Sequence, residues 1–481
     1  MTAATAPYAA DLALFIDGAW QSGEGRDAMP VLNPANAQAM ADLPKATTAD
    51  LAAALAAAER AFPVWRATDV ETRAAVLRKT AQLLRERSED IAVLMTMEQG
   101  KPIAESRSEV MGSAQLFEWC AEEARRMYGR TLVRPSGMRS MVLQQPIGPV
   151  ALFTPWNFPL YLMAKKVAAA LAVGCSVIAK PAEETPGCTT ALMRCLADAG
   201  LPAGVAQLVF GDPAMISSTL IASPVIRKIS FTGSTAVGKH LMRLCADNVT
   251  QSTMELGGHA PVLIFADCDL EKTLDLVVPQ KFRNAGQVCV SPTRFLVEAP
   301  IHDAFVRGFA ERTAGVTMGN GLDATSKMGP LANARRPDAV ATLVDDAVAK
   351  GAALITGGGR ENGPGNFFRP TLLAGVPDSA DIMRVEPFGP VAATRPFETF
   401  DEAIHIANST PFGLAAFAFT ENGRRANLLG DALEAGMIGI NGFGISVADA
   451  PFGGVKQSGF GSEGGQEGLA SYCVTKAVHQ V

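Results

Sequence analysis

The sequence contains no uninterrupted apolar run long enough to cross a bilayer. A membrane-spanning helix needs roughly 20 apolar residues, and the longest run here, Val167 to Ala179, is shorter and includes Gly174 and Ser176. The segment from Met1 to Asp11 lacks the basic start and apolar stretch of a secretory signal. We therefore expect no membrane association.

Cysteine and histidine do not form recognisable clusters either. The eight cysteines include no Cys-x-x-Cys pair, and none of the five histidines has metal-ligand spacing to a cysteine or to another histidine. This excludes a disulfide framework and predicts that the protein has no metal site. Scattered free cysteines are typical of a protein in the reducing cytoplasm.

Positive charge is not in surplus. The chain has 42 Lys and Arg against 48 Asp and Glu, a formal net charge of -6, so nucleic acid is not an expected partner. Hydrophobic residues make up 48% of the chain, an ordinary globular proportion. Because single cores stop growing at roughly 250–300 residues, the 481 residues predict at least two domains.

Short apolar segments alternate with helical patterns from Val150 onward. This alternation predicts an α/β protein with parallel sheets covered by helices on both faces. The change from one sheet to the next is expected after Glu255. The predicted strands are Val150–Phe153, Ser176–Lys180, Gln207–Phe210 and Ile226–Phe231 in the first unit, and Val262–Phe265, Thr293–Val297, Ala353–Thr356 and Ala392–Phe397 in the second.

The N-terminal part has a different pattern. Ala13 to Trp20 and Pro30 to Pro34 are typical of strands, and the apolar spacing from Ala49 to Trp65 and from Glu71 to Met97 predicts helices that stop at Gly100. Arg130 to Gln145 alternates around Pro135-Ser136-Gly137, which predicts a hairpin. A hairpin between helices cannot easily complete a sheet in its own domain, so we expect it to project and pair with another subunit.

Two features indicate a phosphate-bearing ligand. Gly233 and Ser234 follow a predicted strand and precede a helix, where unpaired amides attract phosphate. The G-x-x-x-x-G spacing is weak, and a purely structural turn is the alternative. Lys180 and Glu183 follow another predicted strand, where they could contact phosphate and ribose. The alternative is that they form only surface ion pairs.

Three residues have the chemistry of an acyl-transfer site. Cys289 follows Asn, Gly and Gln in a turn-like segment that would expose a nucleophilic thiol, although most lone cysteines are small core residues. Glu255 lies between apolar residues, where burial would raise its pKa for general-base work, with a helix-capping carboxylate as the alternative. Asn157, in a rigid loop with two prolines and two aromatic residues, could donate to an oxyanion or could belong to a plain turn.

Together these segments resemble the aldehyde dehydrogenase superfamily. The resemblance runs from about Leu14 to Lys476, in the order found in that family. It is carried by Pro155-Trp156-Asn157-Phe158-Pro159, Lys180-Pro181-Ala182-Glu183, Phe231-Thr232-Gly233-Ser234, Glu255-Leu256-Gly257-Gly258, Gly286-Gln287-Val288-Cys289, Glu386-Pro387-Phe388-Gly389-Pro390 and Pro451-Phe452-Gly453-Gly454.

The resemblance implies roles for individual residues. Cys289 matches the nucleophile, Glu255 the general base and Asn157 the side-chain donor of the oxyanion hole. The implied cofactor is NAD, with NADP as the alternative. The positions that match its contacts are Thr154, Pro155, Trp156, Lys180, Glu183, Gly233, Ser234, Leu256, Glu386 and Phe388.

Within the superfamily the chain looks most like succinate-semialdehyde and 2-oxoglutarate-semialdehyde dehydrogenases. Arg283 and Ser446 match two of the residues that hold the distal carboxylate in that group. The third position is Lys165, where that group has arginine, and Tyr161 stands where related chains often have a smaller residue. These departures leave open a neutral or aromatic aldehyde as substrate, in a pocket formed by Phe158, Tyr161 and Phe452.

The resemblance also implies a fold and an assembly. We expect a Rossmann-type cofactor domain from residues 1–124 and 145–254, a catalytic α/β domain from 255–440, and a small β arm from 125–144 and 460–481. This arm would join subunits of a homotetramer, favoured over a homodimer. Two rival functions are a coenzyme A-acylating dehydrogenase, disfavoured by Glu255, and a non-catalytic nucleotide-binding protein, disfavoured by the three catalytic residues.

Overall fold

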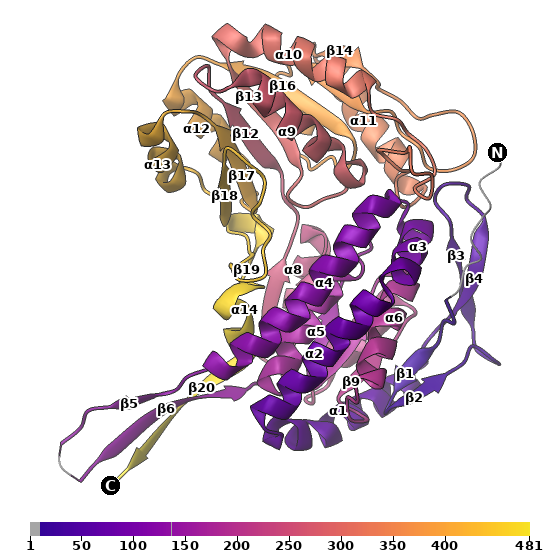
Figure 1. The fold of residues 1–481 in the computed structure, drawn as a ribbon, viewed down its shortest axis with the longest axis vertical. Coiled ribbons are helices and arrows are strands. Elements are labelled where there is room, and N and C mark those ends of the chain that lie inside the picture. Colours follow the sequence, from indigo (N-terminus) through magenta and orange to yellow (C-terminus); the bar gives the residue numbers. More distant parts are fainter. Residues whose placement is uncertain (1–9, 136) are drawn as a thin grey trace.

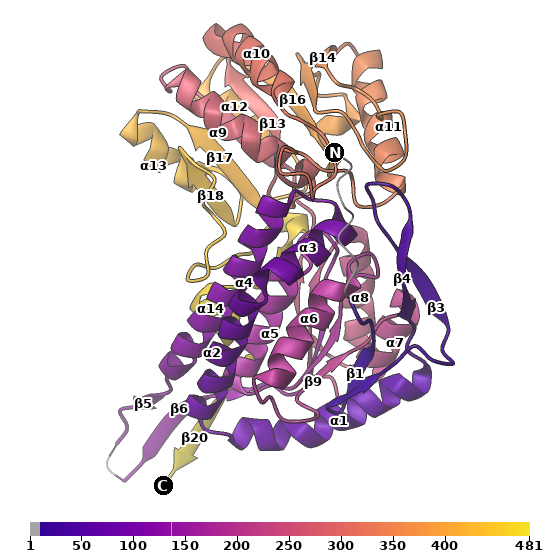
Figure 2. The ribbon, with the colours of Figure 1, turned by 45° about the vertical axis from the view of Figure 1, so that its right-hand side comes forward.

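The structure, a computed structural model that describes residues 10–135 and 137–481, contains two large sheets with helices on both sides (Figures 1 and 2). The first sheet has eight strands in the order β19-β11-β10-β7-β8-β9-β1-β2. The strands from β11 to β9 run parallel, whereas β19, β1 and β2 are antiparallel to their neighbours. Its strands are β1 Leu14–Ile16, β2 Ala19–Gln21, β7 Val150–Phe153, β8 Val177–Lys180, β9 Ala206–Leu208, β10 Lys228–Thr232, β11 Gln251–Glu255 and β19 Gly459–Phe460.

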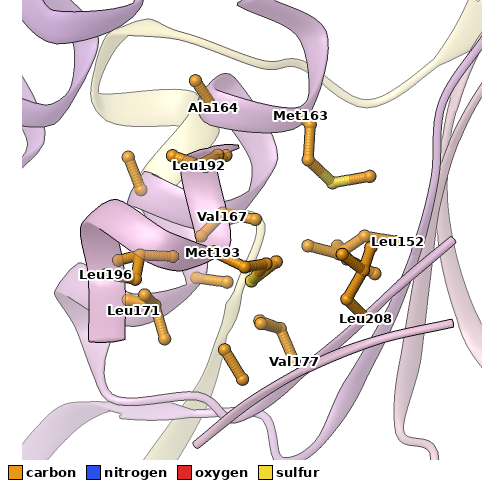
Figure 3. Packing of buried hydrophobic residues seen from close by; sticks show 14 of the residues in the cluster. Leu152, Met163, Ala164, Val167, Leu171, Val177, Leu192, Met193, Leu196 and Leu208 are labelled. Carbon is orange, nitrogen blue, oxygen red and sulfur yellow. The ribbon is translucent and has the colours of Figure 1, made fainter. Parts of the chain in front are cut away.

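The core of the first sheet explains why its strands are continuous apolar runs. Parallel strands with helices on both faces are buried on both sides, and every residue of β7 and β8 is buried. Figure 3 shows Leu152, Val177 and Leu208 of this sheet facing apolar side chains of α5 (Tyr161–Val173) and α6 (Pro186–Asp198). After Tyr161 every residue of α5 is buried, including two lysines.

The N-terminal helices lie beside the first sheet. They are α1 Thr48–Ala67, α2 Val70–Glu86, α3 Ser88–Gln99 and α4 Ile103–Glu123. The helical pattern from Glu71 to Met97 is divided in two at Arg87, and α3 stops as predicted before Gly100, whose φ of 96° favours glycine. Two further helices accompany the sheet, α7 Pro213–Ala222 and α8 Thr235–Asp247.

The second sheet has seven strands in the order β14-β15-β16-β13-β12-β17-β18. All neighbours are parallel except β14 and β15. Its strands are β12 Ala260–Ile264, β13 Pro292–Glu298, β14 Ala353–Thr356, β15 Thr371–Ala374, β16 Val391–Phe397, β17 Ala415–Phe419 and β18 Met437–Ile440. Its helices are α9 Leu270–Phe282, α10 Ala299–Ala314, α11 Arg335–Ala349, α12 Phe400–Asn408 and α13 Gly423–Ala432.

A three-stranded sheet projects from the body of the molecule (Figure 1). It consists of β5 Arg130–Leu132, β6 Arg139–Pro146 and β20 Cys473–Gln480, in the order β20-β6-β5. β20 is antiparallel to β6 along its whole length, from Cys473 opposite Pro146 to Gln480 opposite Arg139. The predicted hairpin and tail strand are therefore present. The predicted turn of the hairpin includes Ser136, which lies outside the described residues.

The structure corrects several details of the sequence-based strands. The segment predicted as one strand, Pro30 to Pro34, belongs to a hairpin of β3 (Ala28–Leu32) and β4 (Ala39–Pro44). Strands β11, β15, β17 and β18 were not predicted, and neither was the return of the C-terminal segment to the first sheet through β19. After β19, the short helix α14 (Gly465–Ala470) leads into β20.

Candidate active site

Apart from Glu386 and Phe388, the predicted cofactor residues lie at the carboxyl ends of the parallel strands of the first sheet. Lys180 ends β8, and its ammonium lies 2.6 Å from the Glu183 carboxylate. Both side chains are largely buried, so they pair with each other and not with surface charges. Nearby, the hydroxyls of Thr154 and Thr232, at the ends of β7 and β10, have no hydrogen-bond partner among the described residues. Unsatisfied buried polar groups at this edge of a parallel sheet are suited to a polar ligand.

The turn from β10 to α8 is a helix N-terminus with free amides. The Ser234 hydroxyl accepts a hydrogen bond from the Val237 amide at 3.4 Å, and Ser234 is the N-cap of α8. Gly233 allows the chain to fold back here, since a Cβ at this position would lie 2.4 Å from the Phe231 ring. The geometry is that of an anion-binding turn, and a hollow of about 590 Å³ beside Glu183 extends toward Pro213 and Arg335.

The loop that carries Asn157 is held by buried polar contacts. The Asn157 carbonyl accepts hydrogen bonds from the Lys101 ammonium at 2.7 Å and from the Asn284 side chain at 3.0 Å. Lys101 is itself paired with Glu109 at 2.7 Å. The side-chain amide of Asn157 donates to the Gln287 carbonyl at 3.1 Å, and one of its two amide hydrogens remains for another acceptor.

Cys289 follows a turn with an unusual backbone. Asn284, Ala285 and Gly286 all have positive φ angles, of 49°, 52° and 71°. The turn packs against the loop after η3 (Asp381–Met383), because a Cβ at Gly286 would lie 2.1 Å from the Gly389 carbonyl oxygen. Cys289 is only half-buried, which separates it from an ordinary core cysteine.

Burial raises the pKa of the Cys289 thiol to about 12, and the nearby Glu386 and Glu255 carboxyls raise it further. Lys165 and the Val290 amide act in the opposite direction. In the protein without ligands the thiol is therefore protonated at neutral pH. A base is needed to make it nucleophilic.

Glu255 is the last residue of β11, so it is not a helix-capping carboxylate. It is almost completely buried, and neither carboxyl oxygen has a hydrogen-bond partner among the described residues. Burial, followed by the neighbouring Glu463 carboxyl, raises the pKa of Glu255 well above its usual value. Its segment reaches the nucleophile loop, since a Cβ at Gly258 would lie 2.3 Å from the Cys289 carbonyl oxygen.

Glu386 and Phe388 belong to the loop that packs, through Gly389, against the turn before Cys289. The Glu386 carboxylate accepts a hydrogen bond from the Gly258 amide at 3.2 Å, and burial raises its pKa to about 8. Phe388 has a φ of 42° and its ring meets that of Trp156 edge-on at 5.6 Å. Leu256 packs onto α8 at Gly238, where a Cβ would lie 2.4 Å from its side chain. Of these predicted cofactor contacts, Glu386 thus lies close enough to Cys289 to raise the pKa of its thiol.

The residues predicted for substrate binding also meet. Lys165 lies over the rings of Phe452, at 4.0 Å, and Tyr161, at 5.4 Å. The Ser446 hydroxyl lies near the Tyr161 phenol and opposes the rise in its pKa that burial causes. Arg283 lies over the Phe158 ring at 5.3 Å. We call these residues the substrate cluster: Phe158, Tyr161, Lys165, Arg283, Ser446 and Phe452.

Arg283 is not part of an internal salt bridge, which was the alternative role for it. It is exposed, and no carboxylate among residues 10–135 and 137–481 lies within 4 Å of its guanidinium. Glu105 interacts with it electrostatically but uses its carboxylate to accept the Asn284 amide at 2.9 Å. The arginine charge is therefore available to a ligand.

Four site residues were missed from the sequence. Lys166 and Glu463 form a buried ion pair next to Glu255, and Lys101 and Glu109 hold the Asn157 loop. The sequence does contain an indication for Lys166. Two adjacent lysines lie in the apolar helix from Tyr161 to Val173, and a buried ammonium group generally needs a buried charged or polar partner. For the others, the partner is distant in sequence and no local pattern indicates it.

Within the described part of the chain, no group of three or more His, Cys, Asp or Glu side chains is arranged to hold a metal ion. No described helix is both long and apolar enough to span a bilayer.

Comparison with known proteins identifies the family. The profile of the aldehyde dehydrogenase family matches residues 20–478. The chain belongs to the aldehyde dehydrogenase family. It is therefore an enzyme of the class that oxidises aldehydes with a nicotinamide dinucleotide, as the resemblance predicted.

Two aldehyde dehydrogenase relatives and one solved structure illustrate the similarity. The 4-(hydroxymethyl)benzenesulfonate dehydrogenase of Comamonas testosteroni is 46% identical, over 97% of this chain and 98% of the relative. The NADP-dependent succinate-semialdehyde dehydrogenase of Escherichia coli is 41% identical, over 96% of each. The structure of betaine aldehyde dehydrogenase of Staphylococcus aureus in complex with NAD+ matches with a TM-score of 0.95 at 34% identity. The match covers 98% of this chain and 95% of that one. The predicted α/β aldehyde dehydrogenase fold is thereby confirmed.

Proposed function

We propose that this enzyme oxidises a small aldehyde that carries an anionic group, with succinate semialdehyde or a related carboxylate-bearing semialdehyde as the first choice. The observation that supports this most strongly is the positive charge of the substrate cluster. Lys165 has no anionic partner within 4 Å among the described residues, and neither does Arg283. The buried Lys165 cation without a counter-ion and the exposed charge of Arg283 together favour an anionic ligand.

We also propose the cofactor assignment. Ser234 and its helix would hold the phosphates, Lys180 and Glu183 the adenosine ribose, and Glu386, Leu256, Phe388 and Trp156 the nicotinamide end. When bound, the dinucleotide accepts the hydride that oxidation of the aldehyde releases. NAD is favoured over NADP because Glu183 would repel a 2′-phosphate, and a tighter binding of NADP in a calorimetric titration would contradict this preference.

Cys289 acts as the nucleophile in this mechanism. Its thiol must lose a proton, and Glu255, a neighbouring carboxylate with a raised pKa, is suited to accept it. The sulfur then bonds to the aldehyde carbon, and the oxygen develops negative charge. The free hydrogen of the Asn157 amide and the backbone amide of Cys289 stabilise this oxyanion.

Glu255 has a second task after oxidation, when the acyl group is held on Cys289 as a thioester. The carboxylate takes a proton from water, the resulting hydroxide adds to the acyl carbon, and the carbon–sulfur bond breaks. The product is a free carboxylic acid. A coenzyme A-acylating reaction is disfavoured because the second step uses Glu255, and an assay with and without coenzyme A distinguishes the two.

A second candidate substrate is an aromatic aldehyde with an anionic substituent. The substrate cluster contains three aromatic rings, and one relative is named as a benzenesulfonate derivative dehydrogenase. Flat rings stack on aromatic side chains, while Lys165 supplies the charge partner.

The test is a comparison of kcat/KM for succinate semialdehyde, 4-sulfobenzaldehyde, hexanal and benzaldehyde. We expect a preference of about tenfold or more for an anionic compound over its neutral counterpart, roughly 1.4 kcal/mol of transition-state binding. Arg283→Leu should raise KM for the anionic aldehyde more than for the neutral one, whereas the exposed Arg384→Leu should change neither. Preference for hexanal or benzaldehyde would contradict the proposal.

We also propose a division into domains, a homotetrameric assembly and a location in the cytoplasm. The division into 1–124 with 145–254, 255–440, and the arm 125–144 with 460–481 is supported by the separate eight-, seven- and three-stranded sheets. A homotetramer joined through β6 and β20 is favoured because their sheet projects from the body. A reducing cytoplasm suits eight cysteines that are all free.

A further inference from the structure

Lys165 differs from every other buried lysine in its surroundings. The ammonium groups of the others contact oxygen atoms: Lys101 meets Glu109, Lys166 meets Glu463, Lys180 meets Glu183, Lys228 meets Thr253 and Lys281 meets Ser291. Lys165, only 3% exposed, makes no hydrogen bond and no ion pair among the described residues. Its ammonium instead faces the rings of Phe452 and Tyr161.

The aromatic faces compensate only part of the cost of burying this charge. A cation over an aromatic ring gains less free energy than a buried ammonium without a partner loses in hydration. An anionic substrate would supply the missing partner. Without it, burial disfavours the ammonium relative to the uncharged amine and so lowers the pKa of Lys165.

The charged and titratable groups that face Lys165 come from several elements. They are Tyr161 on its own helix, Cys120 on α4, Glu255 at the end of β11, Cys289 after η2 (Arg283–Gly286), and Glu463 before α14. Glu463 is already engaged by Lys166, and burial raises the pKa of Glu255 well above its usual value, which weakens Glu255 as a counter-ion for Lys165. Burial consequently lowers the pKa of Lys165, although the carboxyls oppose this.

Lysine at this position also differs chemically from the arginine expected from the resemblance. A guanidinium keeps its charge at every pH that a protein tolerates, whereas an amine can lose its proton. We propose that Lys165 makes substrate selection pH-dependent: its ammonium selects anionic aldehydes, and its neutral amine leaves an aromatic pocket that no longer prefers them. This inference rests on the anionic substrate proposed above.

The direction of the effect follows from the protonation states. Below the pKa of Lys165 the ammonium is present and the preference for an anionic aldehyde is complete. As the pH rises through that pKa, the preference falls by up to about tenfold per pH unit, as for any single ionisation. It levels off where Arg283, which stays charged, provides the remaining attraction.

The experiment measures a ratio, so that other titrating groups cancel. The ratio of kcat/KM for succinate semialdehyde to kcat/KM for butanal is determined from pH 6.5 to 10. Ionisation of Cys289 and Glu255 changes the chemical step that both substrates share. Loss of the Lys165 charge also raises the pKa of the Cys289 thiol for both substrates, but it removes a charge partner only from the anionic one, so only that second effect changes the ratio. We expect a descending ratio in the natural protein, a flat high ratio in Lys165→Arg and a flat low ratio in Lys165→Met.

Lys228→Arg is the matched control. Lys228 is also buried, and burial lowers its pKa to about 8, but its ammonium contacts Thr253 and lies outside the substrate cluster. Its substitution should leave the descending ratio unchanged. A ratio that stays descending in Lys165→Arg, or that becomes flat in Lys228→Arg, overturns the inference.

Failure of the inference can be told apart from failure of the proposed substrate class. If the natural protein prefers succinate semialdehyde at pH 6.5 and keeps that preference to pH 10, only the inference is wrong. If it shows no preference at pH 6.5, the anionic substrate itself is wrong. If the variants do not fold, the natural protein can be tested alone by the rate at which iodoacetamide labels Cys289. Relative to the protection that butanamide gives, the protection that butanoate gives should decrease as the pH rises.

Discussion

The nucleophile owes its orientation to strained residues that precede it. Left-handed backbone costs of the order of 1–3 kcal/mol at a non-glycine residue, and both Asn284 and Ala285 adopt it. The contacts that offset this cost are the Asn284 amide to Glu105 and the Asn284 side chain to the Asn157 carbonyl. The strained turn thus connects the nucleophile to the loop of its oxyanion donor.

At the residue scale, Glu255→Gln separates the two steps that the mechanism assigns to Glu255. A glutamine cannot accept a proton from water, so the thioester should accumulate and kcat should fall by about 10²–10⁴-fold. In the natural enzyme kcat should rise with pH through the raised pKa of Glu255, because only the carboxylate is a base. Near neutral pH, stopped-flow cofactor reduction should show a slowed first turnover, because Cys289 also depends on this base; at high pH, where the thiol ionises without it, a burst followed by a slow phase should appear. Unchanged turnover in the variant would remove Glu255 from the mechanism.

Sequence patterns predicted the residues that carry chemistry better than the residues that hold them. Cys289, Glu255 and Asn157 lie in short motifs whose residue types are informative by themselves. Lys101 and Glu463 act through partners that lie far away in the chain, Asn157 and Lys166. Such pairs exist only after folding, so a local pattern cannot reveal them.

At the scale of elements, helix α4 packs against the start of α5, the helix that carries Tyr161 and Lys165 of the substrate cluster. Glu109 accepts the amides of Leu160 and Tyr161 and so fixes the start of α5. Gly112 leaves room for the Tyr161 ring, since a Cβ there would lie 3.3 Å from its Cε2 atom. Helix α4 also carries Cys120, which faces Lys165.

Gly112→Ala should therefore change kinetics without loss of stability. Alanine stabilises a helix by up to about 1 kcal/mol relative to glycine, so Tm should hold or rise. The added Cβ displaces Tyr161 by tenths of an ångström, and kcat/KM for the best substrate should change by about threefold to tenfold.

Gly430→Ala is the control for this element, because that glycine in α13 has no atom near its missing Cβ. It should raise stability and leave kinetics unchanged. In a Tyr161→Ala background Gly112→Ala should have no further kinetic effect. An equal effect with and without Tyr161 would show that Gly112 acts elsewhere.

The strands show where sequence patterns fail at this scale. The buried parallel strands β7, β8, β12 and β13 were predicted because they are apolar runs between turn signals. β11 was not, because Gln251-Ser252-Thr253 is polar and the strand lies between β10 and the short β19. β19 itself is only two residues long and is defined by its pairing alone.

At the scale of the whole molecule, contacts within a single chain do not explain why the three-stranded sheet projects from the body. β20 covers one edge of β6, and β5 covers only part of the other. Val133, next to this sheet, is 97% exposed. An extended sheet with accessible edges favours pairing with another copy.

Removal of residues 473–481 should therefore alter assembly. Without β20, the β5–β6 hairpin is a two-stranded ribbon, which is marginally stable by itself. Light scattering after gel filtration should show a mass reduced to a half or a quarter of the natural assembly. His479→Ala, which removes only the contact to the Ser140 hydroxyl, is the milder control and should keep the mass. An unchanged mass after the deletion would exclude the sheet as the joining surface.

The return of the C-terminal segment to the first sheet has a consequence for biosynthesis. During translation, Cys289 leaves the ribosome long before Phe452, Gly459 and Glu463, which complete the surroundings of Glu255 and Lys165. A nascent chain thus carries its thiol without a finished base or substrate cluster. We therefore expect catalysis only after the residues up to Glu463 have been made, so that a chain that stops before them should not oxidise aldehydes.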